Sequence, residues 1–144
     1  MITIRPCLII LFHKALCMSQ SLALHIRGCP DHSPAHWSAL RLIRAWQASG
    51  RSIHSVFFSG AAALIGQRLR FTPQGQMNLQ AQWQTMECPL IICVNAAYRC
   101  GILSEIDAAK QQLAAPTTAE GFSIGGLGTL AEAKLEADQL VEFP

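Results

Sequence analysis

The feature that most constrains the fold of this chain is a short, unbroken apolar run near its middle. Residues 90–94 read LIICV, and three of these five residues are β-branched. A run this short and this apolar is typical of a strand that is covered on both faces, as strands are in a parallel sheet. The run therefore predicts a sheet with helices packed on either side of it.

Further strand-like segments occur along the chain, and helical patterns separate them. The other strands are predicted at residues 21–27, 51–58, 122–124 and 139–143. Helical patterns are predicted at residues 34–49, 61–67, 77–86, from 104 onward, and at 129–137. This alternation predicts an α/β fold with three layers, α/β/α, built on a mostly parallel five-stranded sheet.

Local signals mark the ends of some of these helices. Ser33 followed by Pro34 is a helix-start pattern, in which a hydroxyl N-cap precedes a proline at a position that needs no N–H. Gly50 is a plausible C-terminal stop for that helix. Ser104 and Asp107 are spaced like a capping box and predict the start of another helix.

The length and composition fit one domain that associates with other subunits. The chain has 144 residues, of which 51% are hydrophobic and 14% charged. This balance predicts a compact domain with some apolar surface left to bury against partners. We assign the domain to residues 21–144 and treat residues 1–20 as an extension outside it, with Met18 as a second candidate start of translation.

Charge, hydropathy and cysteine content argue against nucleic-acid-binding, secreted and membrane-spanning proteins. The net charge of +2 comes from scattered Lys and Arg residues, so we expect no direct nucleic-acid binding. The apolar core of the first segment, residues 7–12, is too short for a secretory signal, and no stretch approaches the roughly 20 apolar residues of a membrane span. The six cysteines are therefore expected to be free thiols in the cytoplasm.

Cys93 is the strongest candidate for a functional residue. It lies at the end of the central apolar run, just before the sequence becomes polar and is expected to form a loop. In parallel α/β sheets, ligands and chemistry collect at the carboxyl ends of the strands, where helix N-termini can favour a thiolate. The alternative is that Cys93 is a buried, unreactive side chain.

Several other groups of residues are weaker candidates for a functional site than Cys93. Cys29, in the turn after the first strand, is a weaker second candidate for a reactive thiol. Together with His25, His32 and His36 it could be drawn as a zinc site, but half of any usual zinc signature is missing, and polar loop histidines are the favoured interpretation. Glycine-rich residues 125–128 lack the order of a phosphate-binding loop and are better explained by close strand–helix packing. No Ser/His/Asp pattern or carboxylate pair is readable.

Several segments in the correct order resemble the TusD/DsrE family of sulfur-relay proteins. The closing text GFSIGGLGTLAEAKLEADQLVEF is similar to the C-terminal signature of this family, and SVFF and IICVNAAYRCG agree with two further motifs. The resemblance covers about residues 21–143. It implies a DsrE-like fold, and it implies that Cys93 occupies the position of the active cysteine.

The resemblance also implies the function. Such a sulfurtransferase subunit accepts sulfane sulfur as a persulfide on Cys93 from a carrier protein and passes it to the next protein, most often for 2-thiolation of the tRNA wobble uridine. The expected assembly is a heterohexamer with related subunits of the TusB and TusC (DsrH and DsrF) type, and neither a metal nor another cofactor is expected. The alternatives are a DsrE-like subunit of dissimilatory sulfur oxidation and a non-catalytic binding module. The roles of Cys29 and Cys100 stay open.

Overall fold

The computed structural model describes residues 20–144. The expected extension and both candidate start residues, Met1 and Met18, lie outside the described residues, apart from Gln20. The division into a domain and an extension therefore stays a proposal.

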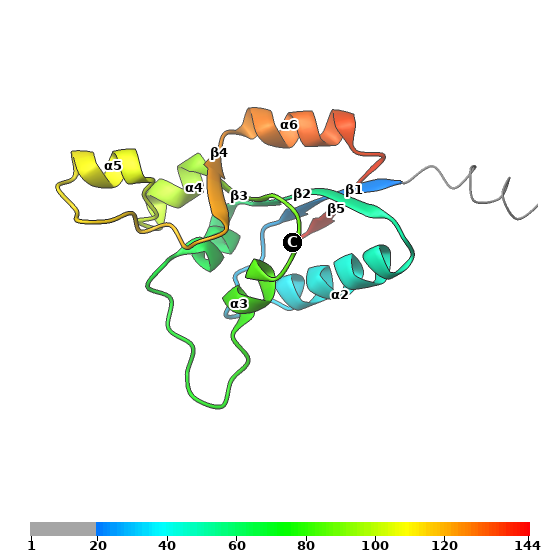
Figure 1. The fold of residues 1–144 in the computed structure, drawn as a ribbon, viewed down its shortest axis with the longest axis horizontal. Helices are drawn as coiled ribbons and strands as arrows, with labels where there is room; N and C mark the ends of the chain where they lie inside the picture. The colour runs from blue at the N-terminus through cyan, green and yellow to red at the C-terminus, as the bar shows by residue number, and fades with distance from the viewer. Residues whose placement is uncertain (1–19) are drawn as a thin grey trace, which may run out of the picture.

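Five strands form one sheet, and every pair of neighbouring strands is parallel (Figure 1). The strands are β1 (Ser21–Ile26), β2 (Ser52–Phe58), β3 (Leu90–Cys93), β4 (Phe122–Gly125) and β5 (Gln139–Phe143). Their order across the sheet is β4-β3-β2-β1-β5. The predicted mostly parallel five-stranded sheet is confirmed.

The helices lie on both sides of this sheet. They are α2 (Ala35–Ala48), the 3-10 helix η1 (Gly60–Gly66), α3 (Leu79–Gln84), α4 (Val94–Arg99), α5 (Glu105–Lys110) and α6 (Leu127–Glu136). In Figure 1, α6 covers one face of the sheet, and α2 and α3 cover the opposite face. The three-layer α/β/α architecture is confirmed, and none of the helices in residues 20–144 is long and apolar enough to cross a bilayer.

The main core lies between the sheet and the α2/α3 layer. Phe58 and Trp83 are fully buried there and meet edge to face, with ring centroids 5.1 Å apart. Burial of such large side chains is the main source of stability in a domain of this size. Leu22, Leu24 and Ile26 are buried on one face of β1 and Ala23 is buried on the other, as expected for a strand covered on both faces.

The helix-start signal at Ser33 is displaced by one residue. The N-cap of α2 is Pro34, and the Ser33 hydroxyl accepts a hydrogen bond from the Ala35 N–H at 3.1 Å. Gly50 follows the helix with a φ of +76°, a conformation that glycine adopts without strain. Ser104 caps α5 as predicted, because its hydroxyl accepts from the Asp107 N–H.

Candidate functional site

Cys93 ends β3, at the carboxyl edge of the sheet, as the sequence predicts. The expectation that a loop follows it is wrong, because α4 begins at the next residue and Cys93 is its N-cap. Ala96 and Ala97 form the buried face of this short helix, and their burial stabilises the helix at this point. The Cys93 thiol is thus held between a strand and a helix, and only 6% of the residue is exposed.

A cavity of about 560 Å³ opens beside Cys93. Gly60, Ala61 and Leu64 of η1 line one part of it, and residues of α4 and its C-cap line another, namely Asn95, Ala96, Arg99 and Cys100. The cavity is largely apolar, and its exposed margin includes Gly60, Asn95 and Arg99. Although little of Cys93 is exposed, its side chain borders a space large enough for a group to approach it.

Arg99 is the charged residue in the lining of this cavity. It is exposed, and among residues 20–144 it makes no ion pair. A free guanidinium carries five N–H donors for an anionic group. The site therefore combines a thiol, an apolar wall and one available positive charge.

The other described cysteines are also free thiols. Cys100 lines the same cavity as Cys93, and its pKa is raised by burial and further by the nearby Cys29. Burial raises the pKa of Cys88 to about 11. Cys88 and Cys100 therefore remain protonated at neutral pH, a state in which a thiol is a poor nucleophile.

The four residues of the possible zinc site do not form a metal-binding cluster. His36 is fully buried, where its Nε2–H donates to the Gly28 carbonyl at 3.0 Å and its Nδ1 accepts from the Trp83 indole at 3.1 Å. His25 lies on β1 and contacts Phe57 instead. Within residues 20–144 there is no group of three or more His, Cys, Asp or Glu that could hold a metal ion. The interpretation as polar loop histidines is wrong for His36 and His25.

One arrangement was not visible in the sequence. His25 hydrogen-bonds to both Glu142 and Ser59, so a carboxylate, an imidazole and a hydroxyl form a continuous chain. The partners lie 117 and 34 residues away from His25 along the chain. No local pattern could have revealed a set that only the parallel sheet assembles.

The glycine-rich segment, residues 125–128, is closely packed at Gly125. A Cβ at Gly125 would lie 2.7 Å from Ile91 Cγ2 and 3.2 Å from the Thr129 hydroxyl. Gly125 therefore leaves room for the Ile91 side chain of β3 and for Thr129 in the first turn of α6. The segment does not form an extended loop, because α6 already begins at Leu127.

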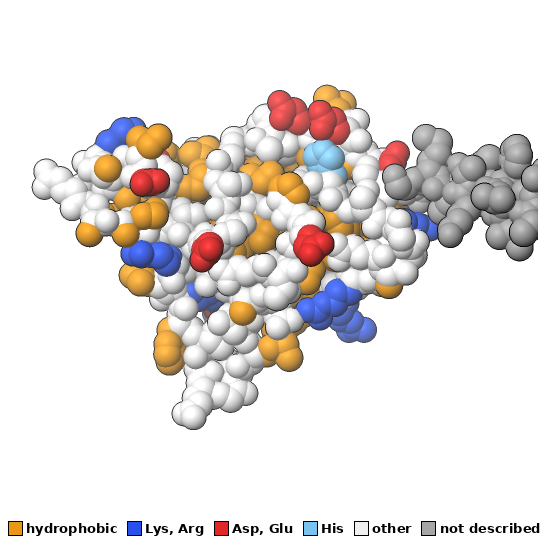
Figure 2. Space-filling view, in the orientation of Figure 1, with side chains coloured by type: hydrophobic (Ala, Val, Ile, Leu, Met, Phe, Trp, Pro, Cys, Tyr) orange, Lys and Arg blue, Asp and Glu red, His pale blue; other side chains and the backbone are white. Residues whose placement is uncertain are grey.

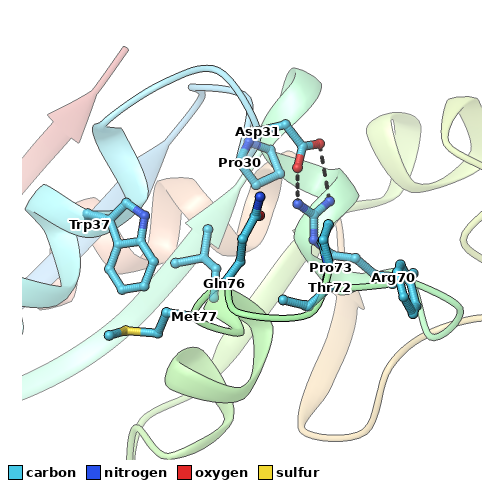
Figure 3. Close-up of a pocket in the computed structure, with 10 residues that line it drawn as sticks. Pro30, Asp31, Trp37, Arg70, Thr72, Pro73, Gln76 and Met77 are labelled. Carbon is cyan, nitrogen blue, oxygen red and sulfur yellow. Dashed lines mark hydrogen bonds and ion pairs between the residues drawn. The ribbon is translucent and has the colours of Figure 1, made fainter.

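A second cavity, of about 350 Å³, lies between the turn after β1 and the segment that joins η1 to α3 (Figure 3). An ion pair between Asp31 and Arg70 closes one side of it, and Trp37 and Met77 lie on the other side. No cysteine lines this cavity. No sequence pattern indicated this cavity, and its lining contains no candidate nucleophile.

Comparisons with known proteins agree with this geometry. Residues 20–143 match the DsrE/DsrF-like family. The chain is 37% identical to the sulfurtransferase TusD of Erwinia tasmaniensis over 119 residues, which cover 79% of this chain and 93% of the relative. It is 36% identical to the sulfurtransferase TusD of Cronobacter sakazakii over 110 residues, or 74% and 86% of the two chains.

A solved structure extends the agreement to the fold. The crystal structure of the YchN protein from E. coli superposes with a TM-score of 0.64 at 23% identity, covering 86% of this chain and 99% of that one. At this identity the likeness concerns the fold alone. With the family match over nearly all described residues, these findings show that the chain belongs to the DsrE/DsrF-like family.

Proposed function

We propose that this chain is a sulfurtransferase of a sulfur relay, and that Cys93 carries the sulfur as a persulfide. The TusD relatives, which are 37% and 36% identical to this chain over the aligned residues, support the activity. The observation that carries the assignment of the residue is the 560 Å³ cavity beside Cys93 at the carboxyl edge of β3.

The chemistry needs few groups. The Cys93 thiolate attacks the outer sulfur of a donor persulfide, the donor S–S bond breaks, and the donor leaves as a thiol. The outer sulfur of the new Cys93 persulfide is then attacked by an acceptor thiolate, which restores the free Cys93. Because Cys93 is only 6% exposed, the donor and the acceptor must each place a thiol inside the cavity, and the walls limit further oxidation of the bound sulfur.

The partners of this chain and the final acceptor of the sulfur follow from the same proposal. Sulfur arrives from a carrier protein and leaves to another, and the chain works with related subunits of the TusB and TusC type in a heterohexamer in the cytoplasm. Large apolar side chains that remain exposed, Leu69, Phe71 and Met77 among them, support association. The destination is the 2-thiolation of tRNA wobble uridine.

A persulfide-transfer assay tests the residue assignment. The full chain is incubated with a persulfurated carrier protein and digested, and the masses of the peptides are measured by mass spectrometry. We expect the mass of one added sulfur, about 32 Da, on the peptide that contains Cys93. The adduct should disappear in Cys93→Ser and persist in Cys88→Ser, which removes a half-buried thiol outside the cavity. A chain that takes up no sulfur would be a binding module instead.

Genetic removal tests the destination. A strain without this chain should lose 2-thiouridine from its tRNA, and the wild-type chain, but not Cys93→Ser, should restore it. If the strain thiolates its tRNA normally but is defective in sulfur oxidation, the chain serves dissimilatory sulfur oxidation instead.

A further inference from the structure

A chain of hydrogen bonds crosses three strands of the sheet next to the Cys93 site. The Glu142 carboxylate on β5 lies 3.1 Å from His25 Nδ1 on β1, and His25 Nε2 lies 2.7 Å from the hydroxyl of Ser59, the residue after β2. The His25 side chain is only 12% exposed. A carboxylate, an imidazole and a hydroxyl in this order are the means by which many enzymes move a proton from a nucleophile.

The strand register places the Ser59 end of these hydrogen bonds next to Cys93. On β2 and β3, Phe57 pairs with Ile91 and Phe58 with Ile92, so the next positions on the two strands are Ser59 and Cys93. Ser59 keeps an extended backbone and its N–H donates to Ile26, which continues the ladder with β1. Neighbouring parallel strands lie about 4.8 Å apart.

The side chains also point to a common face. Side chains alternate along a strand, so Ser59 shares the face of Phe57, and Cys93 shares the face of Ile91. His25 lies on that face as well, since its ring contacts Phe57 with centroids 5.9 Å apart. Gly60 and Ala61, which follow Ser59 directly, line the Cys93 cavity. Register and face thus place Ser59 next to Cys93 on the neighbouring strand, while the hydrogen bond of the Ser59 hydroxyl in this structure is the one to His25.

We propose that Ser59, His25 and Glu142 form a proton relay that serves Cys93, an inference that rests on the proposed role of Cys93 in sulfur transfer. When the two side chains come into hydrogen-bond contact, the Cys93 S–H gives its proton to the Ser59 oxygen while the Ser59 O–H passes its own to His25 Nε2, to which it is already hydrogen-bonded. The resulting thiolate attacks the donor persulfide, and the donor thiolate that leaves takes the proton back from His25. No oxidant or reductant is consumed.

The surrounding charges fit this direction of transfer. The hydrogen bond from His25 Nδ1–H is the main cause that lowers the pKa of Glu142, and the charges of Arg27, just after β1, and Lys134 of α6 lower this pKa further. β2 contributes Phe57 and Ser59, which carry no charge. An ionised Glu142 fixes the proton on Nδ1, so Nε2 is free to accept, and it stabilises the imidazolium that forms. In this relay Ser59 acts directly on the Cys93 thiol, whereas His25 and Glu142 act through Ser59 and are positioning residues.

The pH dependence of Cys93 alkylation tests the relay without any sulfur donor. The full chain reacts with iodoacetamide at a series of pH values, and alkylation of the Cys93 peptide is followed by mass spectrometry. At about pH 7 we expect the rate to fall about tenfold or more in Ser59→Ala and His25→Gln, and less in Glu142→Gln. At alkaline pH, where the thiol ionises unaided, the rates of all variants should converge on the wild-type rate. Ser59→Thr keeps a hydroxyl and should restore the rate at neutral pH.

The chain offers a matched control in a second set of the same three residue types. On the first half of β2, His54 Nδ1 lies 3.0 Å from the Ser55 hydroxyl and His54 Nε2 lies 3.1 Å from Glu136. His54→Gln removes an equivalent imidazole far from the carboxyl edge and should leave the Cys93 profile unchanged. An unchanged profile in Ser59→Ala, a uniform loss at all pH values, or an equal effect of His54→Gln would overturn the relay.

The two proposals fail separately. If wild-type chain takes no sulfur from a persulfurated carrier but Ser59→Ala shifts the alkylation profile, the relay stands and the sulfur-transfer proposal falls. If wild type and Ser59→Ala accept sulfur at equal rates at neutral pH, sulfur transfer stands and the relay falls.

Discussion

At the residue scale, His36 shows how burial fixes one protonation state. Both ring nitrogens are used by the neutral imidazole, one as donor to Gly28 and one as acceptor from Trp83. A second proton would place an N–H against the Trp83 N–H. Burial is the main cause that lowers the pKa of His36 from 6.5 to about 4.

We expect this histidine to make the fold sensitive to acid. Between pH 6.5 and about 4 the unfolded chain binds a proton that the folded chain refuses at His36, so stability falls as the pH drops through this window. From about pH 7 to about pH 4.5 the loss from this residue should be roughly 2 kcal/mol of unfolding free energy. Urea unfolding at the two pH values measures it.

A matched variant separates His36 from the carboxylates, which also titrate in acid. His36→Gln keeps a donor for the Gly28 carbonyl and an acceptor for the Trp83 indole but cannot titrate. It should lose correspondingly less stability on acidification than the wild type. Equal losses in both chains would show that His36 is not the acid-sensitive group.

The sequence predicted single residues where the signal was local. Cys93 lies at the strand end because the apolar run that precedes it is continuous and short, and this can be read without tertiary information. The cavity beside it could not be predicted, since η1 contributes Gly60 and Leu64 from about thirty residues earlier. The burial of His36 was not predicted because a polar side chain favours the surface, whereas pairing of both its nitrogens allows it to be buried.

At the element scale, the turn between β1 and α2 depends on a glycine. A Cβ at Gly28 would lie 2.4 Å from the Ser33 hydroxyl, 2.7 Å from Ala35 Cβ and 2.8 Å from the Pro144 carbonyl oxygen. The last of these atoms belongs to the backbone, so the clash cannot be relieved by one side-chain rotation. Gly28 also provides the carbonyl that accepts from His36.

We therefore expect Gly28→Ala to destabilise the fold by about 1–3 kcal/mol through overpacking. Gly128→Ala is the matched control, because Gly128 lies within α6 and nothing is within 4 Å of its would-be Cβ. That change should stabilise the fold by about 0.5 kcal/mol, since alanine favours helix over glycine. Urea midpoints of the two variants compare them, and loss of stability in both would contradict the steric argument.

The bounds of helices and strands were predicted well where turn or capping residues mark their ends. They were predicted poorly where one element follows another without such residues. The last strand, Gln139–Phe143, is found as predicted. Helix α4 was missed because its exposed residues, Asn95 and Arg99 among them, look like a loop, while its buried face consists only of small alanines. Helix α6 starts two residues before the predicted position, since Gly128 fits inside a helix.

At the scale of the whole molecule, one surface segment stands apart from the rest. Between η1 and α3 the side chains of Leu69, Phe71 and Met77 are 75%, 83% and 65% exposed. This segment projects from the body of the molecule in Figure 1, and Figure 2 shows orange side chains around that projection. Isolated exposed apolar residues are ordinary, but three within nine positions are typical of an interface.

We expect this segment to be covered by a related subunit in the proposed heterohexamer. Phe71→Ser should lower the affinity of assembly about tenfold or more, because a large aromatic side chain at an interface often dominates binding. Its effect on the free chain should be small, since the side chain is already in water. Native mass spectrometry of the chain co-expressed with its related subunits measures the fraction assembled.

Leu135→Ser is the matched control for this experiment. Leu135 is 86% exposed on α6 and lies on the opposite layer from α3. If the segment between η1 and α3 is the interface, the Leu135 variant should assemble as the wild type does while the Phe71 variant does not. Because Cys93 lies in a separate cavity, the unassembled Phe71 variant should still be alkylated at Cys93 at the wild-type rate. Full assembly of Phe71→Ser would place the partner on another face of the molecule.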